Sequence, residues 1–272
     1  MPVVAFSSPK GGVGKTTLAA NVAIALHDLG WGVVAMDFDV QNSLRLHFGI
    51  ELADGRGYVA AHDQPEEWPN LALPTDSGVF VLPYGQVTEQ ERILFERHLM
   101  EEPDYLQRGL GPILERPDWV VLADLPPGPA PALRALDGVG ALHISVLLAD
   151  ATSLSLLPLI ERGHFYGDKR PLVVVNQVDP RRRLSRMVTD FISGRIPESL
   201  LGQVYRDEGA AEAIGWQRSV FEQAPSGVAA RDIRAVAERL SLRLKGEADD
   251  TAETAEDAAP EDGEAGEARK WP

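Results

Sequence analysis

The strongest local pattern in the chain is Lys10-Gly11-Gly12-Val13-Gly14-Lys15-Thr16-Thr17. It follows the apolar run Val3 to Ser7, which is typical of a buried strand, and it opens the segment Thr16 to Leu29, where apolar residues recur every three or four positions. A glycine-rich loop with this ending, placed between a strand and an amphipathic helix, is the context that a phosphate-binding loop requires. We therefore predict that it holds the phosphates of a nucleotide.

Each residue type in this loop has a physical reason. The backbone expected to curl around phosphate oxygens is formed by Gly11, Gly12, Val13 and Gly14. Lys15 is expected to neutralise the β- and γ-phosphates, Thr16 to place its hydroxyl on Mg²⁺, and Thr17 to reach the α-phosphate. A glycine turn that only precedes a helix needs neither the lysine nor the threonine pair, so this structural alternative explains less of the pattern.

Further short apolar runs alternate with helical patterns along the chain. They are Gly32 to Met36, Val79 to Leu82, Trp119 to Ala123, Leu142 to Leu148, Pro171 to Val175 and, more weakly, Leu201 to Tyr205. Alternation of buried strands with helices predicts an α/β fold, a doubly wound and mostly parallel sheet with helices on both faces.

Acidic residues end two of the predicted strands. Asp37 and Asp39 follow the second run, and Asp124 ends the run Trp119 to Ala123 before a turn rich in proline and glycine. Ligands bind at the carboxyl edge of such sheets, where these carboxylates should lie. The alternative is that they are solvated acids at strand ends.

Composition limits the functions that the chain can have. It has 272 residues, 44% of them hydrophobic, and a formal net charge of -15, of which the segment from Gly246 on contributes ten acidic residues against Arg269 and Lys270. Such an acidic chain lacks a strong signature for nucleic acid or anionic lipid. The absence of cysteine excludes disulfides, iron–sulfur ligation and cysteine-based zinc sites.

We predict one P-loop ATPase domain over residues 1–245 and a disordered acidic tail over 246–272, because the tail has no apolar pattern. The segment Ala229 to Leu244 is amphipathic and is interpreted as a helix packed on the sheet rather than as a membrane anchor. Glu51 to Ser77 lacks periodicity and is expected to be a surface excursion. No window approaches the ~20 apolar residues of a membrane span, so we expect a soluble, cytoplasmic protein without direct membrane insertion.

Lys10 is a second lysine at the start of the loop, which an ordinary P-loop does not need. With it, the motif resembles the deviant Walker A group, the ParA- and MinD-like ATPases. The resemblance implies ATP and Mg²⁺ as cofactors and a homodimer in the ATP state, in which Lys10 reaches across the interface to the partner's nucleotide. Lys10, Lys15 and Asp39 would then be catalytic.

The same resemblance implies roles for residues farther along the chain. Asp39 would orient or deprotonate the attacking water, whereas Asp37 and Asp124 would support Mg²⁺ together with the threonine of the loop. Asn176, at the end of a strand, and Pro225, within the segment Gln223 to Gly227, would contact the adenine base.

Several further stretches resemble the BcsQ or YhjQ family of cellulose-biosynthesis accessory ATPases. They are Asn42 to Gly49, Val81 to Gln86, Ala123 to Pro126 and Tyr205 to Ala213, so the resemblance extends over roughly 1–244. It implies a slow, partner-stimulated ATP hydrolase that supports assembly, activity or polar localisation of the cellulose synthase complex. The implied partners are that complex or its small cytosolic regulators, which would recruit the protein to the inner membrane or the cell pole.

Two other functions remain open at this point. A ParA-like partition ATPase would bind DNA nonspecifically, for which the arginines of Arg181 to Arg186 are candidates, although such a run is more often a solvated face. A nucleotide-bound scaffold with little hydrolysis is the third reading, and the presence of Lys15, Thr16, Asp39 and Asp124 argues against it.

Overall fold

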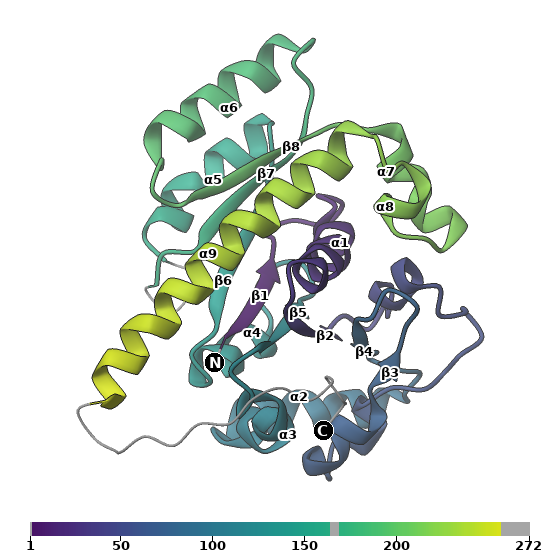
Figure 1. Cartoon of the computed structure of the whole chain (residues 1–272). Helices are drawn as coiled ribbons and strands as arrows, with labels where there is room; N and C mark the ends of the chain where they lie inside the picture. The colour runs from purple at the N-terminus through teal and green to yellow at the C-terminus, as the bar shows by residue number, and fades with distance from the viewer. Residues whose placement is uncertain (1, 164–168, 257–272) are drawn as a thin grey trace.

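The computed structural model describes residues 2–163 and 169–256. Within these residues, eight strands form one sheet in the order β3-β4-β2-β5-β1-β6-β7-β8 (Figure 1). All neighbours are parallel except β3 and β4. The strands are β1 (Val3–Ser7), β2 (Gly32–Asp37), β3 (Leu73–Pro74), β4 (Phe80–Leu82), β5 (Trp119–Asp124), β6 (Leu142–Leu148), β7 (Leu172–Val178) and β8 (Leu200–Tyr205).

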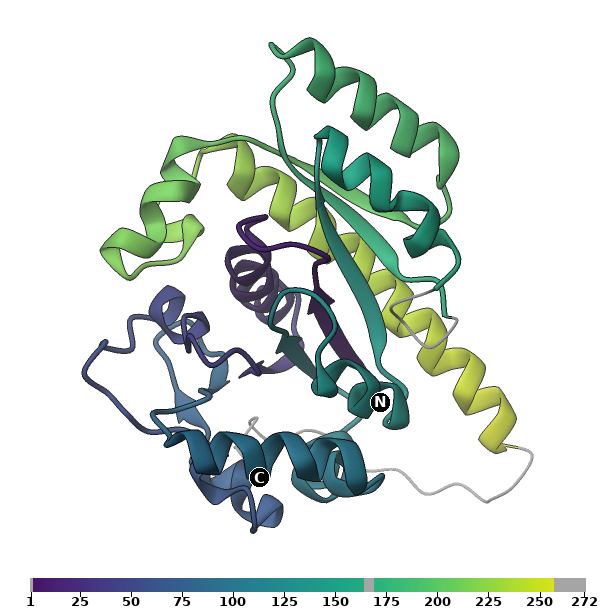
Figure 2. The same cartoon turned by 180° about the vertical axis from the view of Figure 1, so that it is seen from behind.

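Helices cover both faces of the sheet, which confirms the predicted fold class. Figure 1 shows α1 and α9 in front of the strands, and Figure 2 shows α2 to α6 on the opposite face. The helices are α1 (Lys15–Asp28), α2 (Glu89–Glu101), α3 (Tyr105–Leu114), α4 (Pro131–Gly138), α5 (Ala151–Glu161), α6 (Arg183–Arg195), α7 (Glu208–Ala213), α8 (Val220–Gln223) and α9 (Val228–Glu256). Short 3-10 turns occupy Leu44–Phe48, Val59–Ala61, Pro65–Leu71 and Ile214–Trp216.

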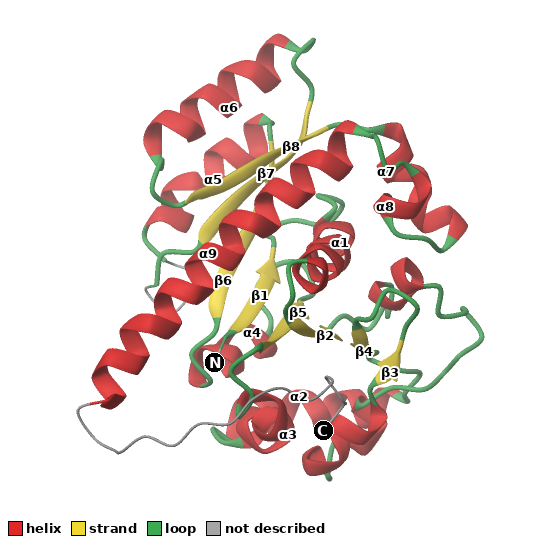
Figure 3. Cartoon of the chain, viewed as in Figure 1, coloured by secondary structure: helices red, strands yellow, loops and turns green. Residues whose placement is uncertain are grey.

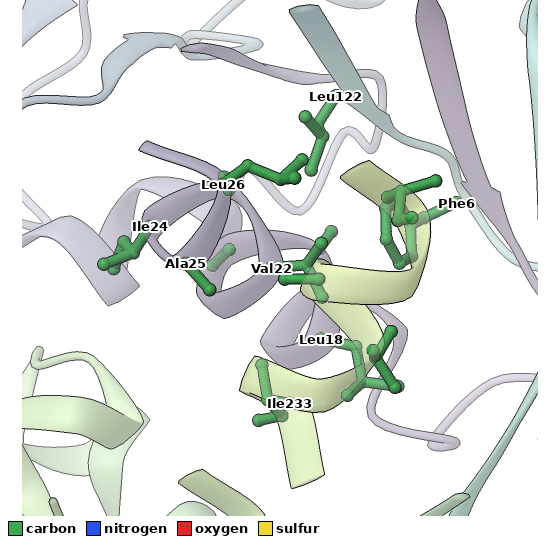
Figure 4. Close-up of a cluster of buried hydrophobic side chains, with 14 of the residues drawn as sticks. Phe6, Leu18, Val22, Ile24, Ala25, Leu26, Leu122 and Ile233 are labelled. Carbon is green, nitrogen blue, oxygen red and sulfur yellow. The ribbon is translucent and has the colours of Figure 1, made fainter. Parts of the chain in front are cut away.

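Alternate residues of each central strand feed two separate cores. On β1, Val4 and Phe6 pack toward α1 and α9, whereas Val3 and Ala5 pack toward the opposite layer. This follows from the two-residue period of a strand whose faces are both covered. Figure 4 shows the first core, where the apolar side of α1 meets the sheet and Ile233 of α9.

The amphipathic segment Ala229 to Leu244 is a packed helix, as predicted. Ile233, Val236, Leu240 and Leu244 are at most 1% exposed. No helix in the described part of the chain is long and apolar enough to cross a membrane.

Helix α9 does not end at the predicted domain boundary. It continues past Lys245 to Glu256, over residues that contain no proline. The rest of the predicted tail, 257–272, lies outside the described residues.

The expectation of a surface excursion at Glu51 to Ser77 needs correction. Tyr58 and Trp68 are fully buried, and their rings contact each other edge to face with centroids 4.8 Å apart. Short 3-10 turns and the two-residue strand β3 occupy the segment, as the view coloured by secondary structure shows (Figure 3). The segment is therefore held to the rest of the protein by two buried aromatic side chains, although its sequence has no periodic apolar pattern.

Candidate nucleotide site

The predicted phosphate loop joins the end of β1 to the start of α1. Gly12 and Gly14 have φ angles of 73° and 80°, in the left-handed region that favours glycine. Gly14 is the N-cap of α1, and neither a side-chain cap nor an acidic residue occupies the helix's first turn. The first turn of α1 thus has no carboxylate of its own at its positive end, which suits an anionic ligand.

Lys15 and Asp124 form a buried ion pair in this loop. Lys15 Nζ lies 2.5 Å from Asp124 Oδ1 and 3.3 Å from Thr16 Oγ1. The side chain of Lys15 is 6% exposed and that of Asp124 is not exposed at all. Burial raises the pKa of Asp124 above its usual value, and the attraction of Lys15 offsets part of this effect.

Asp37 lies beside Asp124, because the parallel register of β2 and β5 pairs these two residues. Its Oδ1 accepts a hydrogen bond from the backbone N–H of Asp39 (2.9 Å) and its Oδ2 accepts one from Leu44 (3.0 Å). Burial, and then the charge of Asp124, raise its pKa well above the usual value. Asp37 therefore holds the backbone of the loop after β2, a positioning role that sequence analysis did not predict.

Asp39 stands in the segment that Asp37 positions. Its side chain is nearly buried, and its Oδ1 accepts a hydrogen bond from the backbone N–H of Gln41 at 2.9 Å. The structure thus brings Lys15, Thr16, Asp37, Asp39 and Asp124 to one edge of the sheet, where the sequence pattern predicted them.

The residues present fit a cation that is held jointly with phosphate. Within residues 2–163 and 169–256, no group of three or more histidine, aspartate or glutamate side chains is arranged to hold a metal ion. Asp124 Oδ2 is buried without a hydrogen-bond partner among these residues. Mg²⁺ usually takes few protein ligands and completes its shell with phosphate oxygens and water, so Thr16 and Asp124 are a sufficient donor set.

Lys10 lies outside this buried cluster. Its Nζ is 2.5 Å from Asp150 Oδ2, and the two side chains are 24% and 38% exposed. Asp150 is also the N-cap of α5 and accepts a hydrogen bond from Ser153 N at 2.8 Å. Sequence reasoning missed Asp150, because nothing in the sequence indicates that α5 begins beside the phosphate loop.

A cavity of about 200 Å³ adjoins the loop on the side of α1. Its walls come from Gly14, Thr17, Asn176 near the end of β7, and the connection from β8 to α7. Asn176 Nδ2 donates to the carbonyl of Val13 at 2.7 Å, and a Cβ on Gly14 would lie only 2.5 Å from that nitrogen. Asn176 thus lies between the phosphate loop and a cavity, and its contact with adenine stays a prediction.

Pro225 is not brought to this cavity. Its carbonyl accepts a hydrogen bond from Arg234 Nη1 at 3.5 Å, and Pro225 is not among the residues that line the cavity. The predicted adenine contact of Pro225 therefore has no geometric support in this arrangement.

Two polar residues near the loop were missed as well. Asn21 is fully buried, donates to the carbonyl of Thr17 at 2.8 Å and accepts from Val220 N at 2.7 Å. His47 is fully buried, with Nε2 3.4 Å from Thr17 Oγ1. The signal for Asn21 was available, since an asparagine inside the run Ala19 to Ala25 must find partners when it is buried.

Comparison with known proteins identifies relatives over almost the whole chain. A family model described as cellulose biosynthesis protein BcsQ matches residues 1–240. The chain is 26% identical to the BcsQ protein of Salmonella typhi, over 91% of this chain and 97% of that relative. It is 31% identical to the BcsQ protein of Salmonella typhimurium over a shorter stretch, which is 56% of this chain and 60% of that relative.

More distant relatives share the architecture. The chromosome-partitioning ATPase Soj of Thermus thermophilus is 28% identical over 89% of this chain and 96% of its own length. The crystal structure of the cell division ATPase MinD from Pyrococcus furiosus superposes with a TM-score of 0.69 at 23% identity, covering 88% of this chain and 98% of that one. The structural match shows that the fold is shared.

Proposed function

Because the chain belongs to the BcsQ family of cellulose biosynthesis proteins, we propose that it is an ATP-dependent, dimerising switch that supports assembly, activity or polar localisation of a cellulose synthase complex. The observation that carries the proposal is the buried pair of Lys15 and Asp124, with Thr16 and Asp39 beside it at the mouth of a glycine loop. Folding by itself does not require a buried lysine beside a carboxylate oxygen that lacks a hydrogen-bond partner.

In this proposal the backbone N–H groups of Gly11 to Gly14 bind phosphate oxygens, and Lys15 leaves Asp124 to neutralise the β- and γ-phosphates. Thr16 and Asp124 hold Mg²⁺, which supplies charge neutralisation at the phosphates. Asn176 and the cavity wall receive the adenosine end, and Thr17 binds the α-phosphate.

Hydrolysis is assigned to two residues around this core. Asp39 orients a water molecule, or accepts its proton, for attack on the γ-phosphate. Lys10 of the second copy stabilises the charge that develops on the transferred phosphoryl oxygens. The partial exposure of Lys10 supports this assignment, because it must leave Asp150 to reach another nucleotide.

The output is a difference in partner affinity between the nucleotide states. A nucleotide shifts a binding equilibrium only if it discriminates two conformations of the protein. The backbone held by Asp37 and the turn after Asp124 are the segments that would sense the γ-phosphate. By family, the partners are the cellulose synthase complex or its small cytosolic regulators, and a cytoplasmic protein would reach the membrane or the cell pole through them.

A partition-type function is the second candidate, favoured by the similarity to Soj and by the exposed arginines at the start of α6. The formal charge of -15 opposes nonspecific DNA binding. A gel-shift assay with ATP and duplex DNA, at low and moderate salt, separates the two functions.

The proposed switch is tested by light scattering with ADP or ATP, with phosphate release read from the same samples. Wild type should dimerise with ATP and release phosphate slowly, Lys15→Ala should stay monomeric, and Asp39→Ala should remain a dimer without release. Arg97→Ala, an exposed change on α2, serves as the matched control. The same oligomeric state with ADP and with ATP, together with no phosphate release, would refute the switch.

A further inference from the structure

Helix α6 presents an apolar stripe to solvent. Leu184, Met187 and Phe191, spaced along one side of the helix, are 48%, 56% and 54% exposed. The neighbouring side, about a quarter turn around the helix, packs on the sheet through Val188 and Ile192, which are at most 1% exposed. Packing within the described chain thus uses one side of α6 and leaves a second apolar side uncovered.

Arginines surround the start of this stripe. Arg182 and Arg183 are exposed, and their guanidinium groups make no ion pair or hydrogen bond with the part of the chain that the structure describes. Arg186 is exposed, and within the described residues its guanidinium group donates to the carbonyl of Pro180 alone. In a chain with a net charge of -15, the four arginines from Arg181 to Arg186 outnumber the two carboxylates nearby in the sequence, Asp179 and Asp190.

The stripe continues into a groove between α5 and α6. Figure 2 shows these helices side by side on the outer face of the sheet, and a cavity of about 470 Å³ lies between them. Leu154, Leu157 and Phe191 line its apolar part, and Arg162 and Arg170 line its charged part. Among the described residues of the lining, the one acidic side chain is that of Glu161, which already pairs with Arg195 at 2.9 Å.

We propose that this α5–α6 surface docks an amphipathic helix of a partner protein, with apolar residues along one side and glutamate or aspartate beside them. The apolar part of the surface fits the i, i+3, i+7 anchors of such a helix, and the unpaired arginines match its acidic flanks. The proposal goes beyond the nucleotide switch and does not depend on it.

Other occupants fit the surface less well. Nucleic acid rewards the arginines but leaves Met187 and Phe191 in water, because phosphates offer them no apolar partner. Three apolar side chains on a strongly acidic protein provide little attraction to an anionic bilayer. The chain's own residues 257–272 are acidic, but Trp271 is their only large apolar residue.

The test is fluorescence anisotropy with the full chain and a labelled helical peptide of about 18 residues, or five turns. The probe carries leucines along one side and glutamates beside them. One comparison peptide replaces glutamate with lysine, and another replaces leucine with serine. Anionic phosphatidylglycerol vesicles and duplex DNA are assayed in parallel.

Wild type should bind the glutamate–leucine peptide at least about tenfold more tightly than either comparison peptide. Met187→Ser with Phe191→Ser, and separately Arg182→Ala with Arg183→Ala, should each weaken binding about tenfold. Leu242→Ser on α9, where the side chain is 71% exposed, and Arg97→Ala on α2 are the matched controls and should bind like wild type.

Equal binding of the three peptides, unchanged binding by the α6 variants, or binding of vesicles or DNA in place of the peptide would overturn the proposal. A fluorescent ATP analogue is titrated into the same samples. Peptide binding without nucleotide binding would support helix docking at the α5–α6 surface and refute the nucleotide switch. Nucleotide binding without peptide binding would refute the docking proposal and leave the switch standing. Unchanged thermal unfolding of the exposed-site variants shows that they are folded.

Discussion

The buried ion pair of Lys15 and Asp124 is poorly explained by a contribution to stability. Burying both charges is costly, and the attraction between them offsets that cost only where the remaining donors and acceptors are satisfied. Asp124 Oδ2 lacks a hydrogen-bond partner within the described residues, so the pair is not optimised for stability. The proposed exchange of this carboxylate for phosphate oxygens at Lys15 would account for both residues.

His47 provides a residue-scale link between pH and stability. Its burial lowers the pKa from the ordinary 6.5 to about 4. The imidazole of the unfolded chain takes up a proton near pH 6.5, whereas that of the folded chain stays neutral down to about pH 4. The unfolded state therefore binds more protons between these values, and stability falls as the pH is lowered through this window.

We predict that the free energy of unfolding drops by about 2 kcal/mol more in wild type than in His47→Gln between pH 7 and pH 5. Urea titrations of both proteins at the two pH values measure this difference. Comparing each protein with itself removes the effect of the substitution on packing. The same pH dependence in both proteins would show that another group is responsible.

At the scale of elements, the segment 51–77 depends on one close backbone contact. A Cβ on Gly57 would lie 2.2 Å from both N and Cα of Gly85. Hydrogen bonds run beside this contact from Tyr58 N to Pro83 O at 3.0 Å and from Gln86 N to Gly55 O at 3.0 Å. The contact places Tyr58 in the aromatic core.

Gly57→Ala should therefore destabilise the protein by about 2 kcal/mol or more, because the backbone of Gly85 cannot move aside without breaking these hydrogen bonds. Gly215→Ala is the matched control, since a Cβ there meets nothing within 4 Å. Urea unfolding monitored by circular dichroism compares the two. Equal free energies of unfolding for the two variants would mean that the backbone around Gly57 and Gly85 can move apart without destabilising the protein.

The sequence predicted those elements whose own residues determine them. The apolar run predicted at Val3 to Ser7 has the same bounds as β1, and the motif from Lys10 to Thr17 follows that strand as expected. The positions of Asp150 and His47 could not be predicted, because both depend on which strands become neighbours. The segment 51–77 was misjudged for the same reason, since its buried aromatics pack on α2 and α3, whose placement the local pattern does not reveal.

At the scale of the whole molecule, the sheet order explains why the site has an open side. β1 lies between β5 and β6, so the loops carrying Lys15, Asp124 and Asp150 meet at one edge. Lys15 is enclosed there, whereas Lys10 is on the outer side of the loop and partly exposed. A two-fold dimer formed across this edge would give each nucleotide the Lys10 of the other copy.

This geometry makes a prediction about mixed dimers. Lys10→Ala and Asp39→Ala should each be inactive alone, because every site lacks one of the two residues. In a mixed dimer, the nucleotide held by the Lys10→Ala subunit keeps its own Asp39 and receives Lys10 from the Asp39→Ala subunit. An equal mixture with random pairing should therefore recover about a quarter of the wild-type phosphate release, because half of the dimers are mixed and each has one complete site.

The alternative, in which Lys10 acts on the nucleotide of its own subunit, gives the opposite result. Every site in a mixed dimer would then lack Lys10 or Asp39, and mixing would recover nothing. Because Lys15→Ala should stay monomeric, mixing Lys10→Ala with Lys15→Ala should recover no activity, whereas recovery there would show that a subunit without bound nucleotide can supply Lys10. Recovery that requires an intact Lys15 in both copies would show that each subunit must bind nucleotide before the interface supplies Lys10.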